Sequence, residues 1–93
     1  MIISLEEAKL FLRVDSGEED TLIVQFIITA EDICEGILRY PLSEFAFKST
    51  PETIKQAILY AVANMYEKRE NFNPREVLSL MSSLLFLYRK EIW

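Results

Sequence analysis

The chain has 93 residues, of which 51% are hydrophobic and 27% are charged, and its formal net charge is −5. Its 15 acidic residues outnumber its 10 basic ones, which argues against a protein that binds nucleic acid or anionic lipid through a broad basic surface. It has no histidine, the commonest general base and transition-metal ligand. We therefore expect no enzyme activity, no cofactor and no metal site.

The length predicts a single domain over residues 1–93. A domain of this size buries little more than ~60% of the surface that its unfolded chain exposes, so its core is thin. The hydrophobic content exceeds what such a core requires. Either all of these hydrophobic side chains pack inside a small helical bundle, or some of them contact other chains. We favour the second interpretation. Cys34, the single cysteine, is expected to be a buried and unreactive side chain.

The first predicted helix follows Ser4, and Glu7 stands at the spacing that completes a capping box. Its apolar residues share one helical face: Leu5, Ala8, Phe11 and Leu12. An acidic turn comes next, formed by Glu18, Glu19 and Asp20. The ordinary interpretation of these three carboxylates is the solvated start of the next helix.

The second predicted helix runs from about residue 17 to residue 38. Its main apolar stripe is Leu22, Phe26, Ala30, Ile33 and Ile37, and a second set widens it: Ile23, Ile27, Cys34 and Leu38. Pro41 ends this helix, because the residue before a proline is biased away from helical geometry. Residues 42–49 are predicted to be an irregular or extended connector.

The third and fourth helices have clear start signals. Thr50 is predicted as the N-cap with Pro51 at the first helical position, and this helix should continue to about residue 70. Its inner face is Ile54, Ala57, Ile58, Ala61, Val62 and Met65. Asn73, Pro74 and Glu76 form the second start signal. The sequence thus predicts an all-α, four-helix domain with two longer central helices.

Three motifs occur in a characteristic order. Residues 5–15 read Leu-Glu-Glu-Ala-Lys-Leu-Phe-Leu-Arg-Val-Asp, residues 51–59 read Pro-Glu-Thr-Ile-Lys-Gln-Ala-Ile-Leu before Tyr66-Glu67-Lys68-Arg69-Glu70, and Leu84-Leu85 precede Tyr88-Arg89. This order resembles the small head–tail connector, or adaptor, proteins of tailed bacteriophages, which are often named DNA-packaging proteins. Leu87 stands where the family commonly has proline, which would let the fourth helix run on toward Trp93.

The resemblance implies a structural virion protein at the head–tail junction, assembled in the bacterial cytoplasm. Such proteins form a ring, expected to be dodecameric, below the portal protein, which joins the head to the tail and extends the DNA channel. The implied partners are further copies of the chain, the portal protein and a tail-side connector or completion protein. DNA is expected to pass through without tight binding, and no membrane is involved.

The alternative is a small helical DNA-binding regulator of phage or prophage origin. A helix-turn-helix regulator needs a recognition helix that exposes basic and amide side chains. The third predicted helix offers at best Lys55, Gln56, Asn64 and Lys68. Measuring the size of the assembly at rising protein concentration would separate a ring from a regulator, which forms a dimer at most.

The candidate subunit-interface residues close the third and fourth helices, at Tyr66, Arg69, Tyr88 and Arg89, with Trp93 at the end. Cations near a helix C-terminus ordinarily offset the helix dipole. Alternatively, arginine can pair bidentately with a carboxylate of a neighbouring subunit or hold the two helix ends together. The acidic turn of Glu18, Glu19 and Asp20 is the predicted partner of at least one of these arginines.

Overall fold

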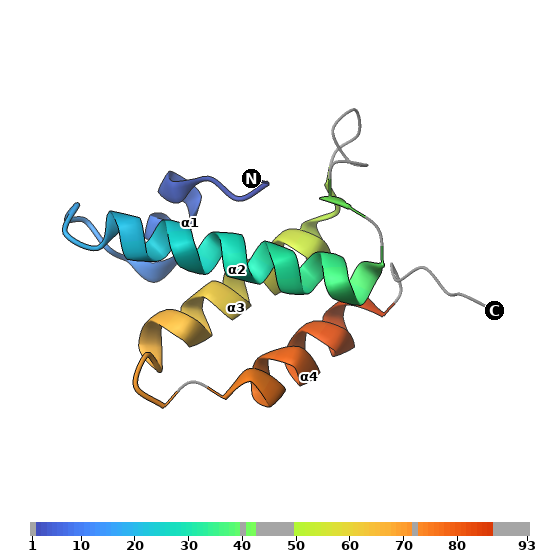
Figure 1. Cartoon of the computed structure of the whole chain (residues 1–93). Helices are drawn as coiled ribbons and strands as arrows, with labels where there is room; N and C mark the ends of the chain where they lie inside the picture. The colour runs from blue at the N-terminus through green and yellow to red at the C-terminus, as the bar shows by residue number, and fades with distance from the viewer. Residues whose placement is uncertain (1, 40, 43–49, 72, 87–93) are drawn as a thin grey trace.

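The computed structural model describes residues 2–39, 41–42, 50–71 and 73–86. It contains four α-helices: α1 (Leu5–Leu12), α2 (Asp20–Leu38), α3 (Glu52–Glu67) and α4 (Pro74–Leu85). No strand occurs among the described residues. The predicted all-α fold with two longer central helices is confirmed (Figure 1).

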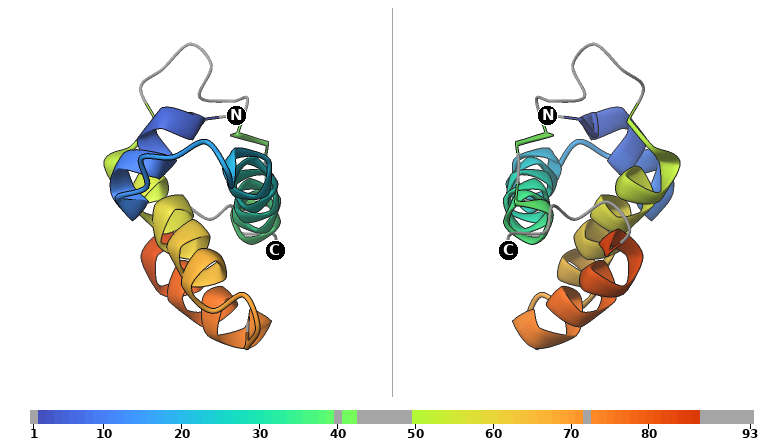
Figure 2. Two further views of the ribbon diagram at one scale, coloured as in Figure 1. Left: turned by 90° about the vertical axis from the view of Figure 1, so that its left-hand side faces the viewer. Right: turned by 90° about the vertical axis from the view of Figure 1, so that its right-hand side faces the viewer.

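The two long helices, α2 and α3, form the central pair of the fold. The shorter helices α1 and α4 each pack against both α2 and α3. In Figure 2, α1 lies toward the top of the molecule and α4 toward the bottom, where α4 runs back along α3. Helices α1 and α4 therefore cover different parts of the central pair.

The start of α1 has the predicted capping box. The Glu7 backbone N–H donates to Ser4 Oγ at 3.1 Å, and the Ser4 N–H donates to Glu7 Oε1 at 3.2 Å. The helix ends at Arg13, whose φ of 61° and ψ of 43° are left-handed. Only Ala8 is fully buried, and Phe11 remains 37% exposed. Phe11, which was predicted to share a face with Leu5, Ala8 and Leu12, lies at the surface edge of that face, where its ring meets the Tyr60 ring edge-on with centroids 5.9 Å apart.

The buried face of α2 lies beside the predicted main stripe. Its fully buried residues are Ile23, Ile27, Ala30, Cys34 and Leu38. The predicted stripe placed Leu22 and Phe26 at the centre, yet both are only partly buried, since they face an open groove at the end of α3. The helix begins at Asp20, three residues later than expected, and ends at Arg39, which is left-handed with a φ of 66°.

The six predicted inner-face residues of α3 are all buried, and Leu59 joins them. The predicted cap was wrong by one residue. Pro51 is the N-cap, in extended geometry with a ψ of 138°, and its carbonyl accepts from the N–H groups of Ile54 and Lys55. The helix also ends earlier than expected, at Glu67.

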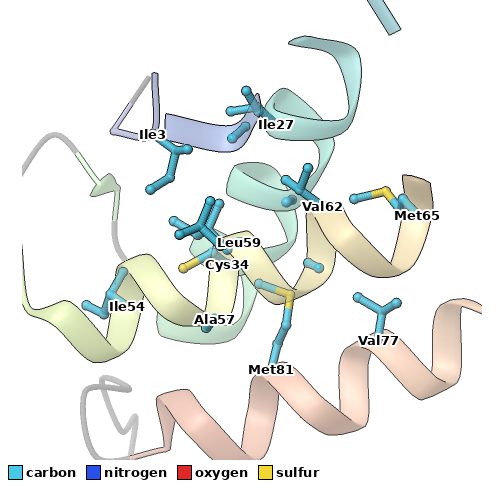
Figure 3. Packing of buried hydrophobic residues seen from close by; sticks show 14 of the residues in the cluster. Ile3, Ile27, Cys34, Ile54, Ala57, Leu59, Val62, Met65, Val77 and Met81 are labelled. Carbon is cyan, nitrogen blue, oxygen red and sulfur yellow. The ribbon is translucent and has the colours of Figure 1, made fainter. Parts of the chain in front are cut away.

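Helix α4 begins as predicted, with Asn73 as its N-cap and Pro74 in the first turn. The Asn73 side chain accepts from the Arg75 N–H at 3.0 Å. Glu76 does not complete a capping box with Asn73, because its carboxylate accepts a hydrogen bond from Lys68 Nζ at 3.0 Å and forms an ion pair with it. The buried residues Val77, Met81 and Leu85 attach α4 to the rest of the fold, and Figure 3 shows Val77 and Met81 pointing toward α3.

Two carboxylates of α2 accept hydrogen bonds from chain segments that lie outside the four α-helices. Glu31 Oε2 accepts from the N–H groups of Ile2 and Ile3 at 2.9 and 3.0 Å, and Glu35 Oε2 accepts from the Leu42 N–H at 2.6 Å. Ile3 and Leu42 are thereby held in the core, at 0% and 5% exposure. Most of the predicted connector, residues 43–49, and the predicted extension of α4 toward Trp93 lie outside the described residues.

Candidate functional site

One polar cluster joins the turn before α2 to the end of α3. Tyr66 donates its hydroxyl proton to Glu19 Oε1 at 2.6 Å, and the Arg69 guanidinium pairs with Glu19 Oε2. The Arg69 guanidinium also lies over the Tyr66 ring, 4.9 Å from its centroid. Glu19 is thus in contact with two side chains that follow it by 47 and 50 residues in the sequence.

The pKa of each ionisable group in this cluster is shifted by the other two groups. The hydrogen bond from Tyr66, followed by the one from Arg69, lowers the pKa of Glu19 below its usual value. The same bond raises the pKa of the Tyr66 hydroxyl, because its proton is held against a carboxylate. The hydrogen bond to Glu19 raises the pKa of Arg69. The cluster therefore stays ionised on Glu19 and Arg69 across the physiological range.

The rest of the acidic turn divides into one paired and one exposed carboxylate. Asp20 Oδ1 lies 2.8 Å from Lys9 Nζ, which ties α1 to the start of α2. Glu18 is exposed, and it makes no ion pair with any other described residue. Of the three carboxylates that the sequence singled out, Glu18 is therefore the one that is directed to solvent.

The structure brings together three of the eight candidate interface residues, because Glu19, Tyr66 and Arg69 are in one cluster. Glu18 and Asp20 are neighbours of Glu19 in the sequence but do not join the cluster. The remaining three, Tyr88, Arg89 and Trp93, lie outside the described residues. The role of these eight residues at a subunit interface remains a prediction.

The sequence did not show which large apolar side chains stay exposed. On α1 and α3 these include Leu10, 82% exposed, and the contacting pair Phe11 and Tyr60. On α4 and just beyond it they are Leu78, Leu80 and Phe86, which are 43%, 40% and 63% exposed, and Leu78 and Leu80 lie on either side of the buried face of the helix. Large apolar side chains in contact with solvent are available for contacts between proteins. The signal was present in α4, where apolar residues exceed what one helical face needs.

The interior shows no chemistry of its own among the described residues. Cys34 is buried, and burial, followed by the nearby charges of Glu31 and Glu35, raises the pKa of its thiol to about 12. No group of three or more cysteine, aspartate or glutamate side chains within the described ranges is placed to hold a metal ion. None of the four described helices is long and apolar enough to span a membrane.

Comparison with known proteins identifies the family. A search of curated proteins and a search of solved structures gave no significant match. The profile of the family described as phage gp6-like head-tail connector protein matches residues 2–92, which is nearly the whole chain and includes all four helices. The resemblance in the three sequence motifs is confirmed, and the chain belongs to the phage gp6-like head–tail connector family.

Proposed function

We propose that this phage structural connector forms a closed ring of twelve copies below the portal, where it joins the head to the tail and extends the DNA channel. The membership of residues 2–92 in the connector family is the basis of the proposal. The observation that supports the ring is the set of large apolar side chains that remain exposed on α1, on α3 and on and just beyond α4. The copies would assemble in the bacterial cytoplasm before they take their place in the virion.

A ring needs a heterologous interface, in which one surface of a subunit meets a different surface of the next. Exposed apolar side chains occur on different helices, among them Leu10 on α1 and Leu80 on α4. In the proposed ring, Leu10 and Leu80 would contact different neighbours.

The charge of the chain supports a channel through which DNA passes without binding tightly. The formal net charge is −5, and three of its basic side chains, Lys9, Lys68 and Arg69, are neutralised by ion pairs within the chain. A protein that holds duplex DNA needs clustered cations to release the phosphate counterions. The net negative charge would repel the phosphate backbone instead. The proposed partners are therefore proteins, namely the portal protein and a tail-side completion protein.

The candidate interface residues take their place in this proposal as two groups. Tyr66 and Arg69, at the end of α3, would contribute to the subunit interface together with Glu19. Tyr88, Arg89 and Trp93 would contribute to it from the C-terminal segment. Arg69 already pairs with a carboxylate of its own chain, so its direct contribution to a neighbour would come from the part of its side chain that stays exposed, 44% of it. Arg89 is then the arginine that is expected to pair between subunits.

Sedimentation velocity over a wide range of concentrations tests assembly. We expect a small species at low concentration and a large, discrete species at high concentration, because association depends on mass action. Leu80→Ser should weaken the large species, since Leu80 is 40% exposed and contributes little to the monomer core. Ser79→Ala, on an exposed polar position of the same helix, is the matched control. A chain that remains monomeric at every concentration, with portal protein added, would refute the ring.

Fluorescence anisotropy with a labelled DNA duplex tests the channel. At physiological salt we expect no binding in the sub-micromolar range. Tight binding would favour the DNA-binding regulator instead. The fold does not favour that alternative, because α3, which carries Lys55, Gln56 and Asn64, is packed against all three other helices, and these three side chains are only partly exposed.

A further inference from the structure

An apolar groove lies between the start of α2 and the end of α3. It is lined by Leu22, Phe26, Met65 and Arg69 and has a volume of about 290 Å³. Its floor is the buried Met65, and Leu22 and Phe26 form a partly exposed wall. The bond to Glu19 holds Arg69 in place at the rim. This volume lies just below the ~300–1,000 Å³ typical of small-molecule sites, so the groove suits one or two apolar side chains of a peptide.

The position of the groove relative to the chain's own end limits what can occupy it. The groove lies toward the left of Figure 1, where α2 begins and α3 ends, whereas α4 ends on the opposite side of the molecule. Helix α4 has 12 residues and so rises ~18 Å away from the end of α3. The seven residues that follow Phe86 span at most ~25 Å when fully extended. If these seven residues returned to the groove of their own chain, they would use most of that length. The same seven residues of a neighbouring copy would not have to span this distance.

The sequence of the C-terminal segment, residues 87–93, matches the groove in its chemistry. It reads Leu-Tyr-Arg-Lys-Glu-Ile-Trp, which combines apolar residues with one adjacent basic pair. The groove is apolar, and the acidic turn that precedes α2 lies at its end, where Glu18 is exposed. Between two chains of net charge −5, a basic pair placed against an acidic turn offsets part of the mutual repulsion.

We propose that the groove receives the C-terminal segment of a second copy. Ile92 and Trp93 would pack against the wall of Leu22 and Phe26, and Arg89 and Lys90 would face Glu18. Because the groove and the origin of the segment lie at opposite ends of the subunit, each copy can give its segment to one neighbour and accept one from the other, which is the head-to-tail contact that closes a ring. This proposal rests on the ring described above and names one of its contacts.

The first test is the binding of a fluorescein-labelled peptide of residues 86–93 to the full-length chain, measured by anisotropy at protein concentrations below those at which the chain assembles. We expect saturable binding. Leu22→Glu should weaken it at least about tenfold, because a carboxylate in an apolar groove is poorly solvated. Ile28→Glu, on an α2 position that is 48% exposed and outside the groove, should leave it unchanged. Thermal unfolding of both variants shows that each remains folded.

Charge reversal gives a second test that does not depend on the core. Glu18→Lys, at an exposed position, should weaken binding of the native peptide, and a peptide carrying Arg89→Glu and Lys90→Glu should regain affinity for this variant. Equal binding by all protein variants would place the peptide elsewhere and overturn the proposal. If the full-length chain forms rings but the peptide does not bind, or if a chain ending at Phe86 assembles like the wild type, the groove contact is refuted while the ring stands.

Discussion

Truncating Met81 tests the division of α4 into a buried and an exposed face. Met81 is fully buried and points toward α3, whereas its neighbour Leu80 is 40% exposed (Figure 3). Replacing a buried methionine by alanine typically costs about 2–5 kcal/mol, because apolar burial is lost and a cavity remains. At ~0.05–0.15 kcal/mol per residue, a chain of this length has a total stability of ~5–14 kcal/mol. Met81→Ala should therefore remove a large share of the stability.

Thermal unfolding followed by circular dichroism measures this loss at a concentration at which the chain is monomeric. A destabilisation of about 2 kcal/mol lowers Tm by roughly 10 °C in a domain of this size. Leu80→Ala is the matched control, and it should change stability by no more than ~0.5 kcal/mol, as an ordinary surface substitution does. If Met81→Ala melts like the wild type, or if Leu80→Ala loses as much, the two faces of α4 have been assigned the wrong way round.

Three further predictions follow from buried or paired groups. Ala61→Asp places an unpaired carboxylate at a fully buried position of α3, which costs several kcal/mol, so this variant should show no cooperative melting transition; wild-type melting would contradict the assigned face. The pKa of Glu19 is lower in the folded chain than in the unfolded chain, so its contribution is present above the unfolded-state pKa and is lost as pH falls through the folded-state pKa. Glu19→Gln should therefore lower Tm at neutral pH and have a much smaller effect at about pH 3, and an equal effect at both pH values would refute the charge-dependent contact. Cys34 should react with a thiol reagent only after unfolding, because its pKa is raised to about 12 and its side chain is buried; fast labelling of the folded chain would show that it is accessible.

The local start signals of the helices could be predicted from the sequence because they depend on residues within a few positions of each other. The capping box of Ser4 and Glu7 and the Asn73 cap occur as expected. The inner face of α3 was also predictable, since a helix covered on several sides is apolar nearly all round. The Thr50 cap was missed by one residue, because Pro51 can occupy either position with the same φ.

Contacts between distant segments could be predicted only in part. The acidic turn was predicted as a partner of at least one arginine, but the sequence left open whether the pairing lies within one chain, as Glu19 and Arg69 do, or between subunits. The carboxylates of Glu31 and Glu35 accept backbone N–H groups from segments that only the tertiary fold brings near, so these contacts had no signal in the sequence. The exact centre of the α2 face was not predictable either, since its periodicity fits two adjacent stripes and only packing against α3 selects Ile27.

Electron microscopy of the concentrated, full-length protein tests the central claim most directly. We expect closed rings of uniform diameter with a central channel, made of twelve copies joined head to tail. The large exposed apolar side chains and the membership of residues 2–92 in the connector family support this outcome. Particles that remain single subunits or two-fold dimers at every concentration, with portal protein also present, would contradict it.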